Sequence, residues 1–165
     1  MKIGYVRIAE RGELNRLLAA FAEALSADGV PLAGAVQHDI ECAPQEKCDM
    51  DLQILPTGPV VRISQNLGKD SRGCRLDTVA LEQAVGITET QLTEAAPALV
   101  IINKFGKHEA DGRGFRSTIA LALEKDVPVL VGVNGANIAA LEEFTGGAVV
   151  DAGTTVADLR NWLGR

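Results

Sequence analysis

Hydrophobic positions along the chain follow two different periodicities. Short continuous apolar runs, which are typical of buried strands, occur at residues 2–6, 31–36, 98–102 and 128–133. Apolar residues at helical spacing occur at residues 14–25, 79–92, 115–123, 138–144 and 156–163. This largely alternating order of strands and helices predicts a parallel sheet with right-handed crossovers.

Capping and turn residues refine this pattern. Asp77 and Thr155 are expected to cap the N-termini of two helices. Residues 50–55 and 60–63 flank a Pro-Thr-Gly-Pro turn at 56–59, which predicts an antiparallel hairpin. We therefore expect an α/β fold with three layers: a mainly parallel sheet, helices on both of its faces, and a small antiparallel hairpin insertion.

Length and composition narrow the class of protein. The chain has 165 residues and is 47% apolar but only 4% aromatic, so we expect a single domain over residues 1–165 with an aliphatic core. A formal net charge of -6 disfavours an open cationic surface for nucleic acid. No apolar run approaches the ~20 residues that span a bilayer, and the N-terminal residues do not resemble a signal peptide. These features predict a soluble cytoplasmic protein, with three cysteines present as reduced thiols.

Basic residues gather in the loop that follows the 98–102 strand. In parallel sheets, ligand sites lie beyond the carboxyl ends of the strands, where these cations and a neighbouring amide could bind an anion. The residues predicted to bind a small anion there are Arg72, Arg75, Asn103, Lys104, Lys107, Arg113 and Arg116. The alternative, weighed equally, is that the cations form structural salt bridges with nearby acidic residues. His108 in the same loop is expected to face solvent.

A metal site has only weak support in the sequence. His38, Cys42 and Cys48 are loosely spaced, whereas structural zinc normally uses tighter cysteine pairs. Asp49 and Asp51 stand two apart in a predicted strand, so they would share a face and could bind a cation together. Free thiols and a solvated acidic pair remain the simpler interpretation, and the sequence names no cofactor.

Several short motifs carry a resemblance to a known family. They are Gln37-His38, Cys48-Asp49-Met50-Asp51-Leu52, Ile63-Ser64-Gln65, the segment 71–77 (SRGCRLD), Asn103-Lys104-Phe105-Gly106-Lys107 and the segment 112–116 (GRGFR). With these motifs the chain resembles an uncharacterised bacterial domain family often encoded near molybdate-transport genes. That family in turn resembles small P-loop nucleoside triphosphatases. The resemblance implies a P-loop-hydrolase-like fold and a link to molybdate handling.

Both Walker motifs of such enzymes are degenerate in this chain. A working P-loop places G-x-x-x-x-G-K-[ST] after the first strand, where the lysine neutralises phosphate. Residues 6–13 read VRIAERGE instead, in which Arg7, Arg11 and Gly12 could still hold a small anion, or form a solvated loop. The relatives' central strand ends in Asp-Glu, which serves magnesium and water, whereas this chain has Asn103-Lys104.

Three functional hypotheses follow. The first is a non-hydrolytic binding or regulatory domain for a small anionic ligand, either a nucleotide or an oxyanion such as molybdate. The second is a nucleoside triphosphatase or phosphotransferase with an unconventional phosphate loop, in which Lys104, Lys107 or Arg113 stabilises the transferred group. The third is a protein-interaction module. Nucleic-acid and membrane partners are not expected, and the sequence leaves the oligomeric state open, homo-oligomers included.

Overall fold

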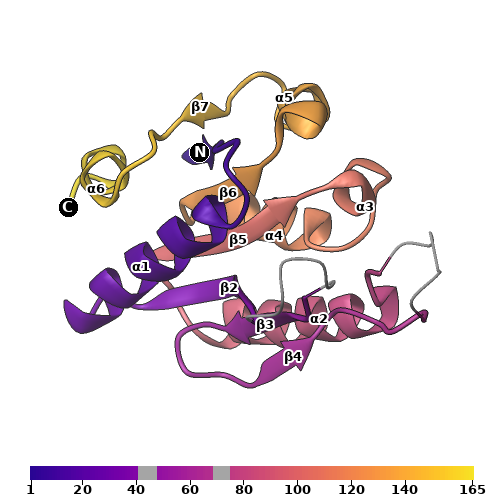
Figure 1. Cartoon of the computed structure of the whole chain (residues 1–165). Helices are drawn as coiled ribbons and strands as arrows, with labels where there is room; N and C mark the ends of the chain where they lie inside the picture. The colour runs from indigo at the N-terminus through magenta and orange to yellow at the C-terminus, as the bar shows by residue number, and fades with distance from the viewer. Residues whose placement is uncertain (41–47, 69–74) are drawn as a thin grey trace.

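A computed structural model describes residues 1–40, 48–68 and 75–165. Within this part of the chain, strands form one sheet in the order β4-β3-β2-β5-β6-β1-β7 (Figure 1). Their bounds are β1 Ile3–Val6, β2 Leu32–Asp39, β3 Met50–Ile54, β4 Val60–Arg62, β5 Leu99–Phe105, β6 Val129–Val133 and β7 Val150–Asp151.

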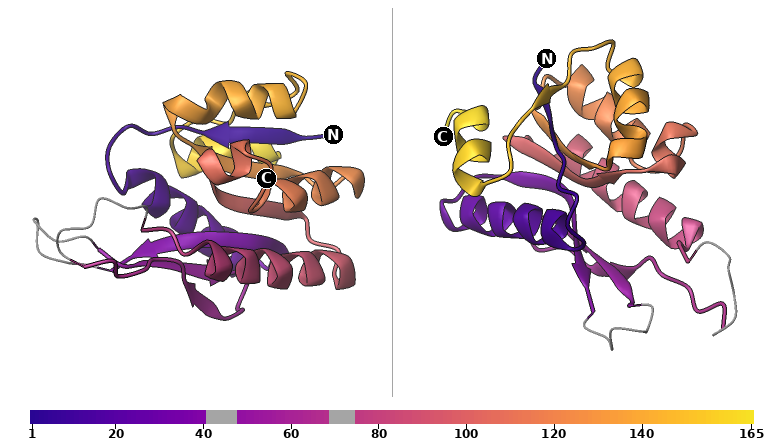
Figure 2. Two further views of the ribbon diagram at one scale, coloured as in Figure 1. Left: turned by 90° about the vertical axis from the view of Figure 1, so that its right-hand side faces the viewer. Right: turned by 45° about the horizontal axis from the view of Figure 1, so that its top comes forward.

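Helices cover both faces of the sheet and give the three layers that the sequence predicted. They are α1 Glu13–Ala27, α2 Thr78–Glu94, α3 Lys107–Ala110, α4 Arg116–Glu124, α5 Ile138–Phe144 and α6 Val156–Leu163, with a short 3₁₀ turn η1 at Gly135–Asn137. One apolar core lies between the sheet and α2, α4 and α5, and the other lies between the sheet and α1 and α6. The right-hand view of Figure 2 separates the indigo α1 and yellow α6 from the helices of the opposite face.

Parallel pairing dominates the sheet, as expected. Strands β2, β5, β6, β1 and β7 are parallel to one another, while β3 and β4 form a hairpin whose strand β3 is antiparallel to both β2 and β4. The hairpin extends the sheet, because β3 pairs with the second half of β2 from Ala35 to Asp39. This pairing also explains why β2 continues beyond residue 36, where the apolar run ends.

Two short elements differ from the sequence prediction. Residues 107–110, expected as loop, form the single turn α3, and Val150–Asp151 form the edge strand β7. Strand β7 pairs with β1 through backbone groups, so its side chains carry little signal. The two predicted caps are confirmed: Asp77 accepts hydrogen bonds from backbone N–H groups of α2, and Thr155 forms a capping box with Asp158.

A glycine allows the closest approach between two central strands. Gly34 in β2 has φ +107°, and a Cβ at this position would lie 1.9 Å from the carbonyl oxygen of Ile101 in β5. Only glycine fits such a position without moving the backbone. Among the described residues, none of the helices is both long and apolar enough to cross a membrane.

Candidate functional site

The carboxyl ends of the parallel strands meet at one edge of the sheet and form a pocket there. This pocket has a volume of about 530 Å³. Strands β2, β3 and β5, the start of α2 and the loop after β5 all contribute to its wall. Four residues predicted from the sequence to bind an anion line it: Arg75, Asn103, Lys104 and Lys107.

Two of these side chains, those of Asn103 and Lys104, lie beside an irregularity in the pairing of β5 with β6. The register between β5 and β6 shifts between Ile102 and Phe105. Asn103 is buried, at 3% exposure, whereas the next residue, Lys104, is exposed. Bulges commonly re-aim side chains beside functional sites. Both side chains line the pocket, Asn103 as a buried amide and Lys104 as an exposed cation.

Asn103 uses its amide to join three elements. Its Oδ1 accepts a hydrogen bond from the backbone N–H of Gln37 at 2.8 Å, and its Nδ2 donates to Asn15 Oδ1 at 3.0 Å. Asn15 in turn donates to Asp39 Oδ2 at 2.8 Å. Asn103 therefore links β5 to β2 and α1 near the carboxyl end of β5.

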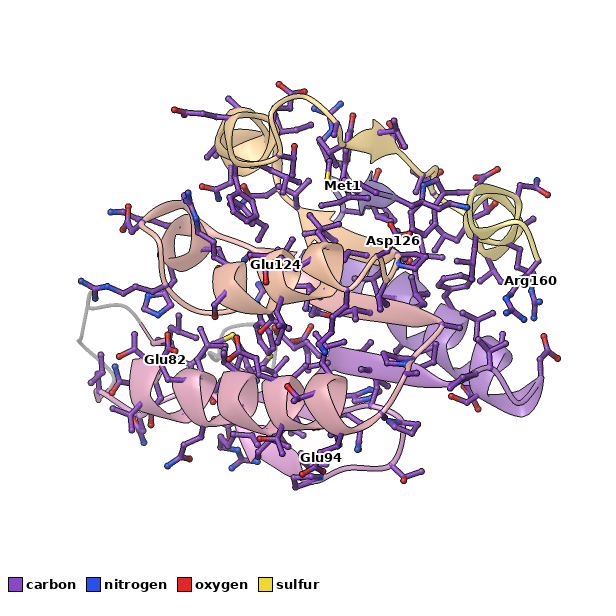
Figure 3. All side chains as sticks on the ribbon, turned by 180° about the vertical axis from the view of Figure 1, so that it is seen from behind. Met1, Glu82, Glu94, Glu124, Asp126 and Arg160 are labelled. Carbon is purple, nitrogen blue, oxygen red and sulfur yellow. The ribbon has the colours of Figure 1, made fainter. Side chains whose placement is uncertain are left out.

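Two glutamates hold the loop after β5 in shape. Glu109 is buried, at 4% exposure, and accepts hydrogen bonds from the N–H groups of Gly106 at 2.9 Å and Phe115 at 3.2 Å. Glu82 of α2 accepts a hydrogen bond from the Gly114 N–H at 2.8 Å. Figure 3 shows Glu82 on α2 near this loop. The carboxylates satisfy backbone donors, so their charges are largely occupied within the loop itself.

His108 lies against α2 and does not face solvent, so that expectation is wrong. Its side chain is only 13% exposed, and its Nε2 lies 3.1 Å from Glu82 Oε1. A second, more open pocket of about 720 Å³ adjoins this pair, sharing Thr78 and His108 with the first pocket. Arg113 lines the second pocket, so the structure separates it from Lys104.

The remaining basic residues of the predicted site have internal partners to different degrees. Arg116 stacks on the Phe144 ring at 4.4 Å and approaches two backbone carbonyls of α3. Arg75 donates to the Cys48 carbonyl at 2.8 Å. Lys107 lies 3.6 Å from Asp111 but is 85% exposed, so that pair is weak. Arg72 lies outside the described residues.

Lys104 also lines the pocket, but unlike Arg75 and Lys107 it has no partner among the described residues. Its side chain makes no hydrogen bond or ion pair with any residue that the structure describes. It runs past Gly106, since a Cβ built on that glycine would lie 3.9 Å from Lys104 Cε. The salt-bridge alternative therefore accounts for part of the basic cluster but not for this residue.

Residues 6–13, which were compared above with a phosphate loop, do not line the pocket. Helix α1 begins at Glu13, where a working loop has its lysine, and Glu13 pairs with Arg16. The Glu13 N–H is hydrogen-bonded to the Glu10 carbonyl at 3.2 Å, so it does not point toward a ligand. Gly12 adopts φ +81° before the helix. Arg7, Arg11 and Gly12 line neither of the two pockets.

The weak metal candidates do not come together in the described part of the chain. His38 is exposed on β2, opposite Asp51 of β3. Cys48 is disulfide-bonded, which corrects the expectation of a reduced thiol at that position, and a disulfide sulfur is no longer a thiolate ligand. Cys42 falls outside the described residues. Within the described ranges, no group of three His, Cys, Asp or Glu residues could hold a metal ion.

The carboxylates of Asp49 and Asp51 both form ion pairs with Arg62. Arg62 lies 3.3 Å from Asp49 Oδ2 and donates from Nε to Asp51 Oδ1 at 2.9 Å. The hydrogen bond that Arg62 donates to Asp51, followed by the charges of both aspartates, raises the pKa of Arg62. The two carboxylates thus hold the β3–β4 hairpin together.

Comparisons with known proteins place the chain in a family and a fold. The family model described as "Protein of unknown function (DUF2478)" matches residues 3–162. Over 146 residues, which make up 88% of this chain, it is 33% identical to the protein named "Molybdenum import ATP-binding protein ModC 2" of Bradyrhizobium diazoefficiens. The match covers only 16% of the length of that protein.

Two solved structures resemble the whole fold. The crystal structure of THEP1 from Aquifex aeolicus has a TM-score of 0.67 at 14% identity, with 100% of both chains covered. The solution structure of a human cancer-related nucleoside triphosphatase has a TM-score of 0.58 at 18% identity, covering 96% of this chain and 92% of the other. At these identities the similarity shows the fold alone, and the fold is the P-loop nucleoside triphosphatase type that the sequence predicted.

Proposed function

The chain belongs to the DUF2478 family, and we propose that it is a binding or regulatory domain that holds a small anionic ligand without hydrolysing nucleotides. The ligand site is the pocket at the carboxyl ends of β2 and β5. One observation carries this proposal: Lys104, near the end of β5, lines that pocket and has no partner among the described side chains and backbone groups.

A basic side chain in such a place attracts anions for a simple reason. Ammonium groups bind phosphate and similar oxyanions through charge-assisted hydrogen bonds, which contribute about 1.5–3 kcal/mol each. Lys107 and Arg75 line the same pocket and add to the positive potential, although each has an acidic neighbour. Because Lys104 is exposed, we expect the lower end of this range and a dependence on ionic strength.

The absence of hydrolysis rests on two positions. Glu13 stands where a P-loop lysine would contact phosphate, and its carboxylate would repel that group. Asn103 stands where the relatives bind magnesium, and its amide is already hydrogen-bonded on both sides. An amide is also a weak substitute for a carboxylate at a hard cation. These two changes lie at different places in the fold and support the same conclusion.

The link to molybdate rests on a relative. A protein whose name describes molybdenum import and ATP binding contains a segment similar to this chain, and that segment is a small part of its length. We therefore propose that the domain works beside a molybdenum import ATPase, and that its anionic ligand is linked to molybdate handling. The cytoplasm is the proposed compartment for such a domain.

Isothermal titration with molybdate, sulfate, phosphate and ATP tests the binding proposal. At least one of these anions should bind, and Lys104→Gln should weaken its binding about tenfold at low salt. The matched control is Lys125→Gln, which removes an exposed ammonium at the C-terminus of α4 and should leave affinity unchanged. Failure of all four anions to bind at millimolar concentration would overturn the proposal.

A phosphate-release assay tests the second half of the proposal. ATP and GTP with magnesium should show no turnover above a protein-free blank. Steady turnover that disappears in Lys104→Gln but persists in Lys125→Gln would instead support the phosphotransferase hypothesis, with Lys104 stabilising the transferred group.

A further inference from the structure

The pocket beside Lys104 has an apolar floor. Leu52, Ile63, Leu81 and Phe115 line it and are at most 6% exposed, so they form part of the core beneath it. Met50 also lines the pocket and is only partly buried. A floor of this kind offers dispersion contacts and dehydration to an apolar group but gives no hydrogen bond to an oxyanion.

The size of the pocket also argues against a bare oxyanion. Its volume of about 530 Å³ falls within the range of roughly 300–1,000 Å³ that is typical of pockets for organic ligands. A tetrahedral anion such as phosphate or molybdate would fill a small part of this space. An anion pressed against the apolar floor would lose hydration without compensation.

The polar groups of the pocket are unequally available. Glu109 gives its oxygens to two backbone N–H groups, and Lys107 has Asp111 beside it. Asn137 donates its side-chain N–H to Asn134, which occupies one group of each of these two amides. Lys104 is the lining cation that has no acidic partner among the described residues, and Lys107, whose exposed pair with Asp111 is weak, can add its charge.

We propose that the ligand is an amphipathic aromatic anion, with a planar ring on the apolar floor and one anionic group at Lys104. This inference rests on the proposed anion-binding function and adds the chemical class of the ligand. Such a ligand satisfies both halves of the pocket at once, because its ring loses contact with water while its charge stays near the rim. The phosphate-loop position takes no part, since its residues lie outside this pocket.

A series of four phosphates tests the proposal by titration calorimetry: inorganic phosphate, methyl phosphate, phenyl phosphate and 1-naphthyl phosphate. The anionic group stays the same while the apolar body grows. Burial of apolar groups should raise affinity at least tenfold between inorganic and phenyl phosphate, with a further gain for the naphthyl compound. The heat-capacity change should become more negative along the series, as expected for apolar burial.

Variants of the floor show whether the ring lies there. Met50→Gln keeps the length of the side chain but adds an amide, and it should reduce the gain from phosphate to naphthyl phosphate severalfold. Met50→Leu should retain most of the gain, since the floor stays apolar. The matched control is Val60→Gln, which changes an exposed apolar residue that lines neither pocket and should leave the series unchanged.

The outcomes separate this inference from the proposed function. If all four phosphates bind equally and Lys104→Gln weakens each of them, the anion site stands and the aromatic ligand is wrong. If none binds, the anion site itself is wrong. If 1-naphthol binds as tightly as 1-naphthyl phosphate, the pocket is purely apolar and both proposals fail. A ring-dependent gain that survives Met50→Gln unchanged would place the ring elsewhere and overturn the inference.

Discussion

Replacing Glu109 by Gln should destabilise the protein and loosen the loop that forms one wall of the pocket. Glu109 is buried and its two oxygens accept hydrogen bonds from Gly106 and Phe115, which lie at the two ends of that loop. A glutamine has one oxygen and one NH₂ group. It can therefore keep one of these bonds, but it must direct N–H hydrogens toward the other backbone donor.

The magnitude follows from the two bonds. Hydrogen bonds to charged groups contribute about 1.5–3 kcal/mol each, and a buried donor left unsatisfied costs about 1–3 kcal/mol. Loss of one bond and weakening of the other should cost about 2–4 kcal/mol of the free energy of unfolding. For a chain of this size each kcal/mol shifts Tm by about 2–4 °C, so the melting temperature should fall by roughly 4–16 °C.

Urea denaturation followed by circular dichroism measures the change, and amide hydrogen exchange locates it. The N–H groups of Gly106 and Phe115 should exchange faster in the variant than in the parent. The control is Glu124→Gln, an exposed carboxylate at the end of α4, which should change stability by at most about 0.5 kcal/mol. A Glu109→Gln variant as stable as this control, with both amides still protected, would refute the reasoning.

Three further predictions test the fold. Gly34→Ala should lower the free energy of unfolding by more than about 4 kcal/mol, because its Cβ would meet the carbonyl of the neighbouring strand. Gly86→Ala, in open space on α2, should raise it by about 0.5–1 kcal/mol. Equal effects of the two variants in urea denaturation would contradict this reasoning. Asn103→Asp should cost about 1–3 kcal/mol, since a carboxylate cannot donate to its amide partner on α1, and an unchanged urea midpoint would contradict it. The pKa of Asp158 is lowered mainly by its hydrogen bond with the threonine that caps α6, so its stabilisation is present at neutral pH and lost as the pH falls through that lowered pKa. The emission of Trp162, the only tryptophan, should then report acid loosening of α6, and Asp158→Asn should remove this response.

The main elements of the fold could be predicted because their signals are local. Apolar runs such as residues 98–102 and helical spacing such as residues 14–25 report which side of an element is buried, whatever its neighbours are. The caps at Asp77 and Thr155 act within a few residues of their own position. The absence of a G-x-x-x-x-G-K-[ST] pattern at residues 6–13 could also be read directly, because that motif is defined by residue types at fixed spacing.

The arrangement of the candidate site depended on contacts between distant residues, and no local pattern encodes these. Lys104 lines the pocket without a partner among the described residues, whereas Asn103 joins α1 and β2, although both were predicted as ligands of the same anion. Arg113 was directed to a neighbouring pocket, and Arg116 was taken by an aromatic ring. Residue types and spacing determined which charges this chain carries and which residues of the phosphate-loop motif it does not contain at residues 6–13. The packing of strands and helices alone decided which of those charges remain available, because each depends on a partner far away in the sequence.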